Sequence, residues 1–173
     1  QRTWQSLSLT PAADLQQRLL TVWAEPLRHY HTLQHLSECL THFEATRALA
    51  ERPGEVAIAL WFHDAVYDLK AKDNELRSAQ WAVQELRRSG ADEALCQRVH
   101  ALIMATCHDA EPTGADAQLL VDIDLAILGA SPARFAEYDQ QVRAEYAWVP
   151  QLLYTFKRRQ VLQGFLQRDA IYG

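Results

Sequence analysis

The hydrophobic positions along this chain recur with helical spacing, and the alternating pattern of a strand is nearly absent. Leu15, Leu19 and Val22, for example, fall on one face of a helix that Thr10-Pro11 would begin. Proline suits the first helical position because its missing N–H has no intrahelical partner there. Since the other apolar segments follow the same spacing, the pattern predicts an all-α protein.

Capping residues, prolines and glycines divide this pattern into about seven or eight helices. Asp73, Asp92 and Ser131 stand where a side-chain oxygen can cap a first turn, and Gly90 stands where a helix ends. The segment at 55–63 is apolar on all sides, which is typical of a buried helix. The expected helices lie at about 11–24, 32–50, 55–63, 73–89, 92–106, 116–128, 132–149 and from 151 onward.

Size and composition predict one compact helical bundle over residues 1–173. Hydrophobic residues make up 49% and charged residues 23% of the chain, as in ordinary globular proteins. The longest apolar run, Val56–Phe62, is seven residues and too short to cross a membrane. Three widely spaced cysteines without a Cys-x-x-Cys pair favour a reducing compartment, so we expect a cytoplasmic protein.

Ionisable residues interrupt two of the most apolar segments. His63 and Asp64 end the central apolar helix, and Asp122 and Asp124 lie within another. A buried carboxylate without a partner costs several kcal/mol, so such groups are usually hydrogen-bonded, ion-paired or bound to a cation. Asp122 and Asp124 are about 200° apart around a helix, so only one of them faces a given site. Periodicity alone does not choose between them.

Two histidines near the start of the second helix add further metal-ligand types. His31 and His35 share a face if the helix begins by His31, but if Thr32 caps the helix, His31 lies just outside it. Imidazole and carboxylate groups are natural ligands of Zn²⁺, Mn²⁺ and iron. Histidines and aspartates from three helices would leave coordination positions for water and substrate, as a catalytic ion needs.

The order His35, His63-Asp64, Asp124 resembles the H…HD…D pattern of the HD superfamily. Longer segments are similar to one bacterial family of small single-domain proteins, described as predicted metal-dependent HD phosphohydrolases. The likeness extends from about position 23 to position 172. Four segments carry it: Tyr30-His31-x-x-x-His35, Trp61-Phe62-His63-Asp64-x-x-Tyr67-Asp68, Asp73-Asn74-Glu75-x-x-Ser78-Ala79 and Asp122-x-Asp124-Leu125-x-x-Leu128-Gly129.

The resemblance implies a hydrolytic metal centre. It favours Asp124 over Asp122, and His35 over His31, as ligands. The ion would be a divalent transition metal (Mn, Fe, Zn, Co or Ni, with Mg as a further candidate), present as one or two ions. It would lower the pKa of bound water, and the resulting hydroxide would attack phosphorus. The implied metal ligands are His35, His63, Asp64 and Asp124.

The same resemblance implies three catalytic residues: the ligand Asp64, together with His31 and Glu75. His31 matches the general acid of cyclic-nucleotide phosphodiesterases, although Thr32 stands where those enzymes have Asn; a hydrogen bond at the helix start is the alternative role. Glu75 would bind a second ion or hold the water, or else it complements a helix dipole. His108 is a second candidate for that role, or it follows a helix end.

The implied substrate is a phosphomonoester or phosphodiester of a nucleotide or another small metabolite. Its binding candidates are Arg28, Tyr30, His108 and Arg143, with core packing or a solvated position as the alternatives. The net charge of −5 argues against duplex nucleic acid as a partner. A non-catalytic metal-binding or ligand-sensing HD module and an HD-type di-iron oxygenase are the alternative functions. A homodimer is a possible assembly.

Overall fold

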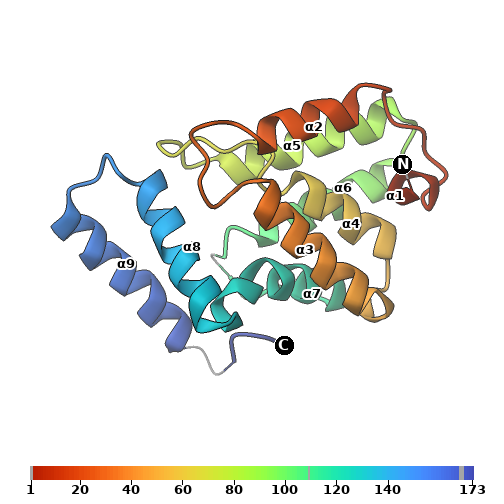
Figure 1. Cartoon of the computed structure of the whole chain (residues 1–173). Coiled ribbons are helices and arrows are strands. Elements are labelled where there is room, and N and C mark those ends of the chain that lie inside the picture. Colours follow the sequence, from red (N-terminus) through yellow and green to blue (C-terminus); the bar gives the residue numbers. More distant parts are fainter. Residues whose placement is uncertain (1, 109, 168–169) are drawn as a thin grey trace.

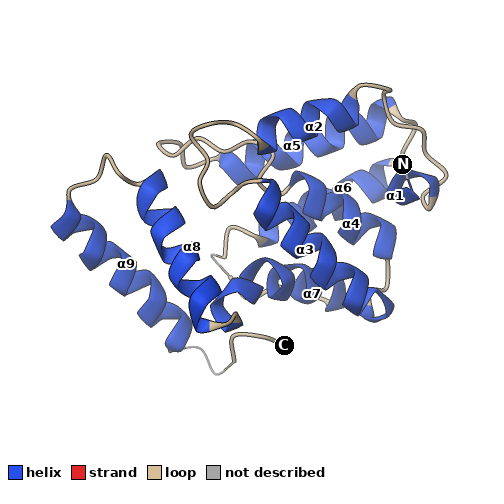
Figure 2. Cartoon of the chain, viewed as in Figure 1, coloured by secondary structure: helices blue, strands red, loops and turns tan. Residues whose placement is uncertain are grey.

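The computed structural model describes residues 2–108, 110–167 and 170–173, which contain helices and no strand (Figures 1 and 2). The all-α prediction is therefore confirmed. None of the helices within these ranges is long and apolar enough to cross a membrane. The helices are α1 (Arg2–Gln5), α2 (Leu15–Trp23), α3 (Leu33–Thr46), α4 (Pro53–Phe62), α5 (Asn74–Arg88), α6 (Glu93–Ala105), α7 (Ala115–Asp124), α8 (Pro132–Glu145) and α9 (Gln151–Leu166), with 3₁₀ turns at Arg47–Leu49 and Leu125–Gly129.

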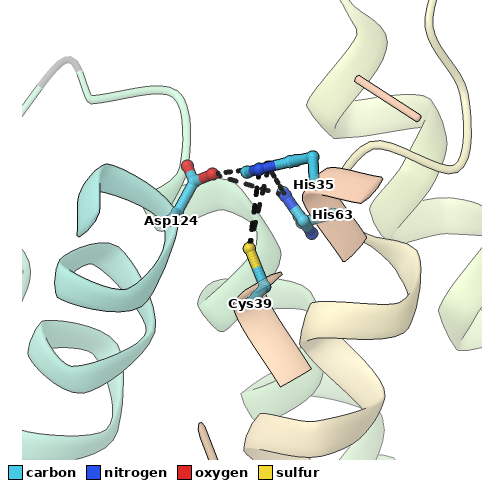
Figure 3. Close-up of side chains that lie close together, drawn as sticks. All are labelled: His35, Cys39, His63 and Asp124. Atoms are coloured by element: carbon cyan, nitrogen blue, oxygen red, sulfur yellow. Dashed lines mark hydrogen bonds and ion pairs between the residues drawn. The ribbon is translucent and has the colours of Figure 1, made fainter. Parts of the chain in front are cut away.

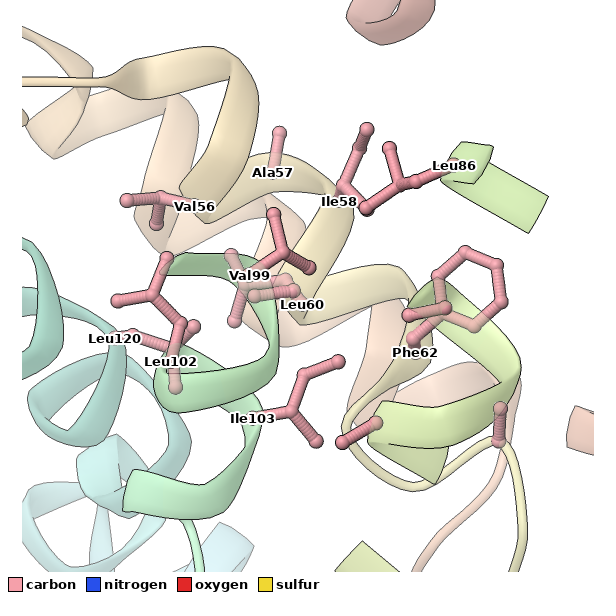
Figure 4. Packing of buried hydrophobic residues seen from close by; sticks show 14 of the residues in the cluster. Val56, Ala57, Ile58, Leu60, Phe62, Leu86, Val99, Leu102, Ile103 and Leu120 are labelled. Carbon is pink, nitrogen blue, oxygen red and sulfur yellow. The ribbon is translucent and has the colours of Figure 1, made fainter. Parts of the chain in front are cut away.

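Helix α4 lies at the centre of the bundle because its sequence is apolar on every face. Eight of its ten residues are buried, and it packs against α3, α5, α6 and α7. Val56, Leu60 and Phe62 have no exposed surface, and Figure 4 shows them among side chains such as Leu86 of α5 and Ile103 of α6. Burying a side chain of this size stabilises the fold by about 1.5–3 kcal/mol. The predicted central helix is thus confirmed.

The caps expected of Asp92 and Ser131 form, as does the alternative cap at Thr32, and the cap expected of Asp73 does not. Thr32, Asp92 and Ser131 each accept a hydrogen bond from a backbone N–H in the first turn of the helix that follows. Asp73 precedes α5 without such a bond. The side chain of the neighbouring Asn74 instead forms two hydrogen bonds with the preceding loop: it accepts one from the backbone N–H of Asp68 and donates one to the Asp68 carbonyl oxygen. The cap expected of Asp73 is therefore wrong, because a loop contact takes its place.

The first long helix begins later than Thr10-Pro11 predicts. Helix α2 starts at Leu15, because residues 2–9 form a short helix and a turn of their own. Trp4 is buried in the core, and its carbonyl accepts a hydrogen bond from the amide of Leu9. The chain therefore passes Pro11 in an irregular segment instead of a first helical turn.

A smaller hydrophobic cluster joins α8 to the rest of the bundle. Its buried residues are Tyr30, Ile127, Tyr138 and Val142, so it links the loop before α3, the 3₁₀ turn after α7, and α8. Helix α9 lies beside α8, where Arg158 bonds the Tyr138 hydroxyl (Figure 1). His35 lies between this cluster and the main core: its ring contacts Tyr30 of the smaller cluster and Cys39 of the main core.

Shortening the Leu60 side chain tests how much the core around α4 contributes to stability. Leu60→Ala removes a fully buried side chain, so we expect the free energy of unfolding to fall by about 2–5 kcal/mol. Leu152→Ala, at a residue that is 88% exposed, is the matched control and should change it by less than about 0.5 kcal/mol. Urea unfolding followed by circular dichroism measures both. Equal losses in the two variants would contradict this assignment of the core.

Candidate metal centre

Four side chains from the ends of three helices converge on one point. His35 lies in the first turn of α3, His63 and Asp64 directly follow α4, and Asp124 ends α7. The Nε2 atoms of His35 and His63 are 3.2 Å apart. Asp64 Oδ2 lies 3.1 Å from His63 Nε2 and 3.7 Å from His35 Nε2. Asp124 Oδ1 lies 3.4 and 3.2 Å from the same two nitrogens, and Figure 3 shows it turned towards them.

A hydrogen bond on the far side of the His63 ring determines which nitrogen faces the cluster. Nδ1 lies 2.8 Å from the carbonyl oxygen of Leu60, which only accepts, so Nδ1 carries a hydrogen. In the neutral ring, Nε2 is then the lone-pair nitrogen and faces the other ligands. A backbone partner of this kind usually accompanies a metal-binding histidine. Trp23 packs against the ring, with centroids 5.5 Å apart.

The charges of the cluster need a cation for balance. Burial alone would raise the pKa of Asp64 and of Asp124, but the neighbouring histidines outweigh burial and lower both. Burial would likewise lower the pKa of His63, but the two carboxylates raise it well above its ordinary value. A proton on His63 would therefore offset part of the charge of the two carboxylates. A divalent cation can take the place of that proton.

The cluster is open on its carboxylate side. The side chains of His35 and His63 are 2% and 1% exposed, whereas those of Asp64 and Asp124 are 13% and 14% exposed. The histidine rings thus form the buried floor of the site. A group bound at this point would keep contact with solvent on the side of the two aspartates.

Cys39 is a further candidate donor, one turn after His35 on α3. Its sulfur lies within 4.8 Å of the donor atoms of His35, His63 and Asp124, so these four residues could also hold a metal ion. The sulfur is 3.7 Å from both ring nitrogens of His35, which places it beside the ring and out of line with the Nε2 lone pair. Burial, reinforced by the nearby carboxylates, raises the pKa of the thiol well above its usual value. Asp64 Oδ2 and the sulfur both lie 3.7 Å from His35 Nε2, but despite burial the neighbouring histidines lower the pKa of the Asp64 carboxyl, whereas the thiol holds its proton more tightly. We therefore favour Asp64 as the fourth ligand.

The two aspartates of α7 have different surroundings, as their angular separation requires. Asp122 accepts hydrogen bonds from the Gln118 side chain and from the backbone N–H of Gly173. Asp124 instead faces the two histidines. Of the two alternatives that periodicity leaves open, the structure brings Asp124 to the cluster.

His31 lies beside the cluster and is held by a separate partner. Because α3 begins at Leu33, His31 precedes the helix and does not share its face with His35. Its Nδ1 is 2.9 Å from Oε2 of Glu145, the last residue of α8. Burial would lower the pKa of His31, but Asp64 and Glu145 outweigh burial and raise it. Its side chain is 21% exposed, at the edge of the open side.

His108 meets the cluster through Asp124. Its Nε2 is 3.1 Å from Oδ2 of Asp124, while His35 and His63 approach Oδ1 of the same carboxylate. The backbone of His108 has φ +56°, in the left-handed region that costs a residue with a side chain about 1–2 kcal/mol. Backbone strain of this kind is common where a site requires a particular side-chain position. The role in substrate binding predicted for His108 stays a prediction.

Arg28 braces the turn behind the site. Its guanidinium donates hydrogen bonds to the carbonyl oxygens of Asp64 and Ala65, at 2.6 and 3.0 Å. It also pairs with Glu25, and the residue is only 5% exposed. The structure thus gives Arg28 a part in holding the turn that carries His63 and Asp64. The substrate contact expected of it stays a prediction.

Of the candidates Tyr30, Glu75 and Arg143, Tyr30 contacts one of the four ligands. Tyr30 is buried, with its ring centroid 4.7 Å from that of His35. Glu75 lies in the first turn of α5, where it adds to the effect of burial in raising the pKa of Tyr146. Arg143 donates to the carbonyl oxygen of Tyr146 and braces the turn between α8 and α9. Among the described residues, no hydrogen bond or ion pair joins Glu75 or Arg143 to the four ligands.

The structure places two further residues here, Cys39 and Glu145, to which the sequence pattern gives no role. Cys39 follows His35 by four residues, the spacing of neighbours on one helix face, so the pattern contained its signal. Glu145 is 114 positions from His31, and only the tertiary fold brings them together. The segment Arg143-x-Glu145-Tyr146 offered no spacing from which that contact could be predicted.

Comparisons with protein-family models, with curated proteins and with solved structures find no match to this chain. The likeness to HD phosphohydrolases therefore rests on the sequence motifs alone and stays a prediction. The geometry is an independent observation, because nothing in the order of the motifs requires their side chains to meet.

Replacing Asp124 tests the metal centre. Asp124→Asn removes one charged ligand atom from the cluster. Loss of a residue that only supports a ligand weakens metal binding by up to about 100-fold, so loss of the ligand itself should weaken Zn²⁺ or Mn²⁺ binding by more than that. Asp122→Asn is the matched control, since Asp122 bonds Gln118 and Gly173 instead, and it should bind like the wild type. Calorimetric titration of chelator-treated protein measures both. Similar losses in the two variants would rule out Asp124 as a specific ligand.

Protons should compete with the ion for the cluster. Because Asp64 and Asp124 raise the pKa of His63, the metal-free protein holds a proton that the ion must displace. We therefore expect Zn²⁺ affinity to rise as the pH increases through and above the ordinary histidine range. Titrations in two buffers with different ionisation enthalpies measure the protons released. Binding that releases none at neutral pH would refute this cause.

Proposed function

We propose that the protein is a metal-dependent phosphohydrolase of the HD type. The supporting observation is that the Nε2 atoms of His35 and His63 lie 3.1–3.7 Å from carboxylate oxygens of Asp64 and Asp124. Two imidazole nitrogens and two carboxylate oxygens at such distances make a ligand set for one divalent ion. Their order along the chain resembles that of HD proteins.

The donor set favours a transition metal over Mg²⁺. Imidazole suits Mn, Fe, Co, Ni and Zn ions, whereas Mg²⁺ prefers carboxylate and water oxygens. When bound, such an ion polarises a phosphoryl oxygen and makes a coordinated water more acidic. His108 and the second oxygen of Asp124 offer donors for a second ion, which the proposed reaction does not require.

His31 is the residue that we assign to proton donation. It lies at the open side of the cluster, close enough to Asp64 for that carboxylate to raise its pKa. As the attacking water forms a bond to phosphorus, the bond to the leaving oxygen breaks and that oxygen keeps the electron pair. His31 then supplies the proton that the leaving oxygen needs. The proton of the attacking water passes to solvent, and His31 regains its own from there.

The proposed phosphate contacts depend little on arginine. Arg28 is bonded to carbonyl groups behind the site, and Arg143 is bonded within the turn between α8 and α9. Positive charge for the phosphate would then come from the ion and His31. A small phosphorylated metabolite, including a nucleotide, suits such a site better than a duplex does, because the chain carries a net charge of −5.

Exposure of the carboxylates supports a catalytic centre over a structural one. A structural site is closed by its ligands and often uses thiolates. Asp64 and Asp124 are 13% and 14% exposed, and the thiol of Cys39 lies beside the ring of His35. A ligand-sensing module shares this open side, so turnover is the measurement that separates it from an enzyme. A di-iron oxygenase would need more histidine ligands than His108 alone adds.

Metal analysis followed by a phosphoester screen tests the proposed activity. Protein purified without chelator is analysed for metals, loaded with Mn²⁺, Co²⁺, Fe²⁺ or Zn²⁺, and assayed on aryl phosphates and nucleotides. We expect turnover that Asp64→Ala abolishes together with metal binding, while circular dichroism still shows a helical protein. Asp122→Asn should retain activity. Metal binding without turnover on any substrate would reject the hydrolase in favour of the ligand-sensing alternative.

A further inference from the structure

We propose that Glu145 is a positioning residue for the reaction and acts through His31. This role rests on the function proposed above and involves no contact between Glu145 and substrate. Glu145 ends α8 and is 2% exposed. A carboxylate buried to this extent is costly unless both of its oxygens accept hydrogen bonds. Its hydrogen-bond partners therefore indicate what it holds in place.

One oxygen of Glu145 holds the backbone that carries His31. Oε1 accepts hydrogen bonds from three consecutive backbone N–H groups, those of His29, Tyr30 and His31, at 2.9, 2.8 and 3.1 Å. Successive N–H groups around one anion form a concave nest that favours negative charge. The loop before α3 is thus folded around the carboxylate, and its path depends on α8.

The other oxygen holds the ring of His31. Oε2 lies 2.9 Å from Nδ1 of His31 and accepts a hydrogen bond from the Tyr67 hydroxyl at 3.1 Å. Tyr67 also stacks on the His31 ring, with centroids 4.1 Å apart and planes inclined by 27°. Tyr30 meets the same ring edge-on, at 4.8 Å. Contacts with its face, its edge and its Nδ1 atom therefore set the orientation of the imidazole.

This arrangement determines which nitrogen of His31 a substrate can meet. Carboxylate oxygens only accept hydrogen bonds, so the Nδ1 that faces Glu145 carries a hydrogen. Nε2 lies on the opposite side of the ring and is the atom left for the leaving oxygen. His63 is oriented in the same way, by an acceptor at Nδ1. An oxygen acceptor at Nδ1 thus orients both histidines, the proposed metal ligand His63 and the proposed proton donor His31.

An amide at position 145 separates the structural part of this contact from the positioning part. In Glu145→Gln the carbonyl oxygen can still accept the three backbone N–H groups, but the NH₂ group then faces Nδ1 of His31. Nδ1 must accept that hydrogen bond, so the ring hydrogen moves to Nε2. Glu137→Gln is the matched control, because Glu137 is half-exposed on the same helix.

Nitrogen-15 NMR of the histidine rings tests this placement without reference to turnover. In Zn²⁺-loaded protein at mildly alkaline pH, we expect the His31 ring hydrogen on Nδ1 in the wild type and in Glu137→Gln. In Glu145→Gln we expect it on Nε2. Loss of the signals in His31→Asn assigns them. An unchanged tautomer in Glu145→Gln would overturn the proposed positioning, even in a protein that is an active hydrolase.

Hydrolysis of two phosphoesters tests the connection to the reaction. An alkyl leaving group needs a proton more than a nitrophenolate does. His31→Asn and Glu145→Gln should therefore each lower kcat by about 100-fold or more for the alkyl ester and far less for the nitrophenyl ester. KM and metal content should stay at wild-type values, as should every parameter of Glu137→Gln.

The double variant distinguishes positioning from a merely structural effect. Because Glu145 acts through His31, adding Glu145→Gln to His31→Asn should cause no further loss. Additive losses, or equal losses on both esters, would mean that Glu145 only stabilises the fold. A wild type that binds metal but hydrolyses neither ester would overturn the proposed function and the catalytic part of this role, and the NMR result would still decide the placement of His31.

Discussion

The candidate site depends on the close approach of two carboxylates to two imidazole rings, an arrangement that favours a bound proton or cation. Asp64 and Asp124 approach two imidazole nitrogens to 3.1–3.7 Å at the meeting point of three helix ends. A proton on His63 would offset part of their charge. Burying these groups costs free energy, and hydrogen bonds from the surrounding structure keep them in place. The carbonyl oxygen of Leu60 orients the His63 ring, and Arg28 donates hydrogen bonds to carbonyl oxygens of the turn that follows α4. Three of these residues, His35, His63 and Asp124, belong to a group that could hold a metal ion.

The fold supplies this arrangement through two packing units of unequal size. The main core surrounds α4, eight of whose ten residues are buried, and so holds the helix end that His63 follows; it also contains Cys39, one turn after His35 on α3. The smaller cluster around Tyr138 brings α8, and with it Glu145, against the loop before α3. The candidate ligands thus depend mainly on the first unit, and the orientation of His31 depends on the second.

The sequence predicts the parts of this structure that arise from local pattern. The apolar faces of α4 predict its burial, and Thr32, Asp92 and Ser131 mark helix starts because a cap is a contact within one turn. The start of α2 and the cap expected of Asp73 are wrong, because contacts made elsewhere in the fold decide both. The meeting of the two histidines with Asp124 accords with the motif order, whereas Glu145 lies too far along the chain from His31 for any spacing to predict it.

The small size of the second cluster has a consequence for how the protein loses its structure. Local opening requires less free energy where fewer apolar side chains are buried, and the cluster that holds α8 has four buried residues against the many that surround α4. Detachment of α8 would release Glu145 and the loop before α3 while α4 and α7 stay packed. Under the proposed function, partial unfolding would yield a species that keeps a bound ion but has lost the orientation of His31, so metal retention alone would not report an intact site.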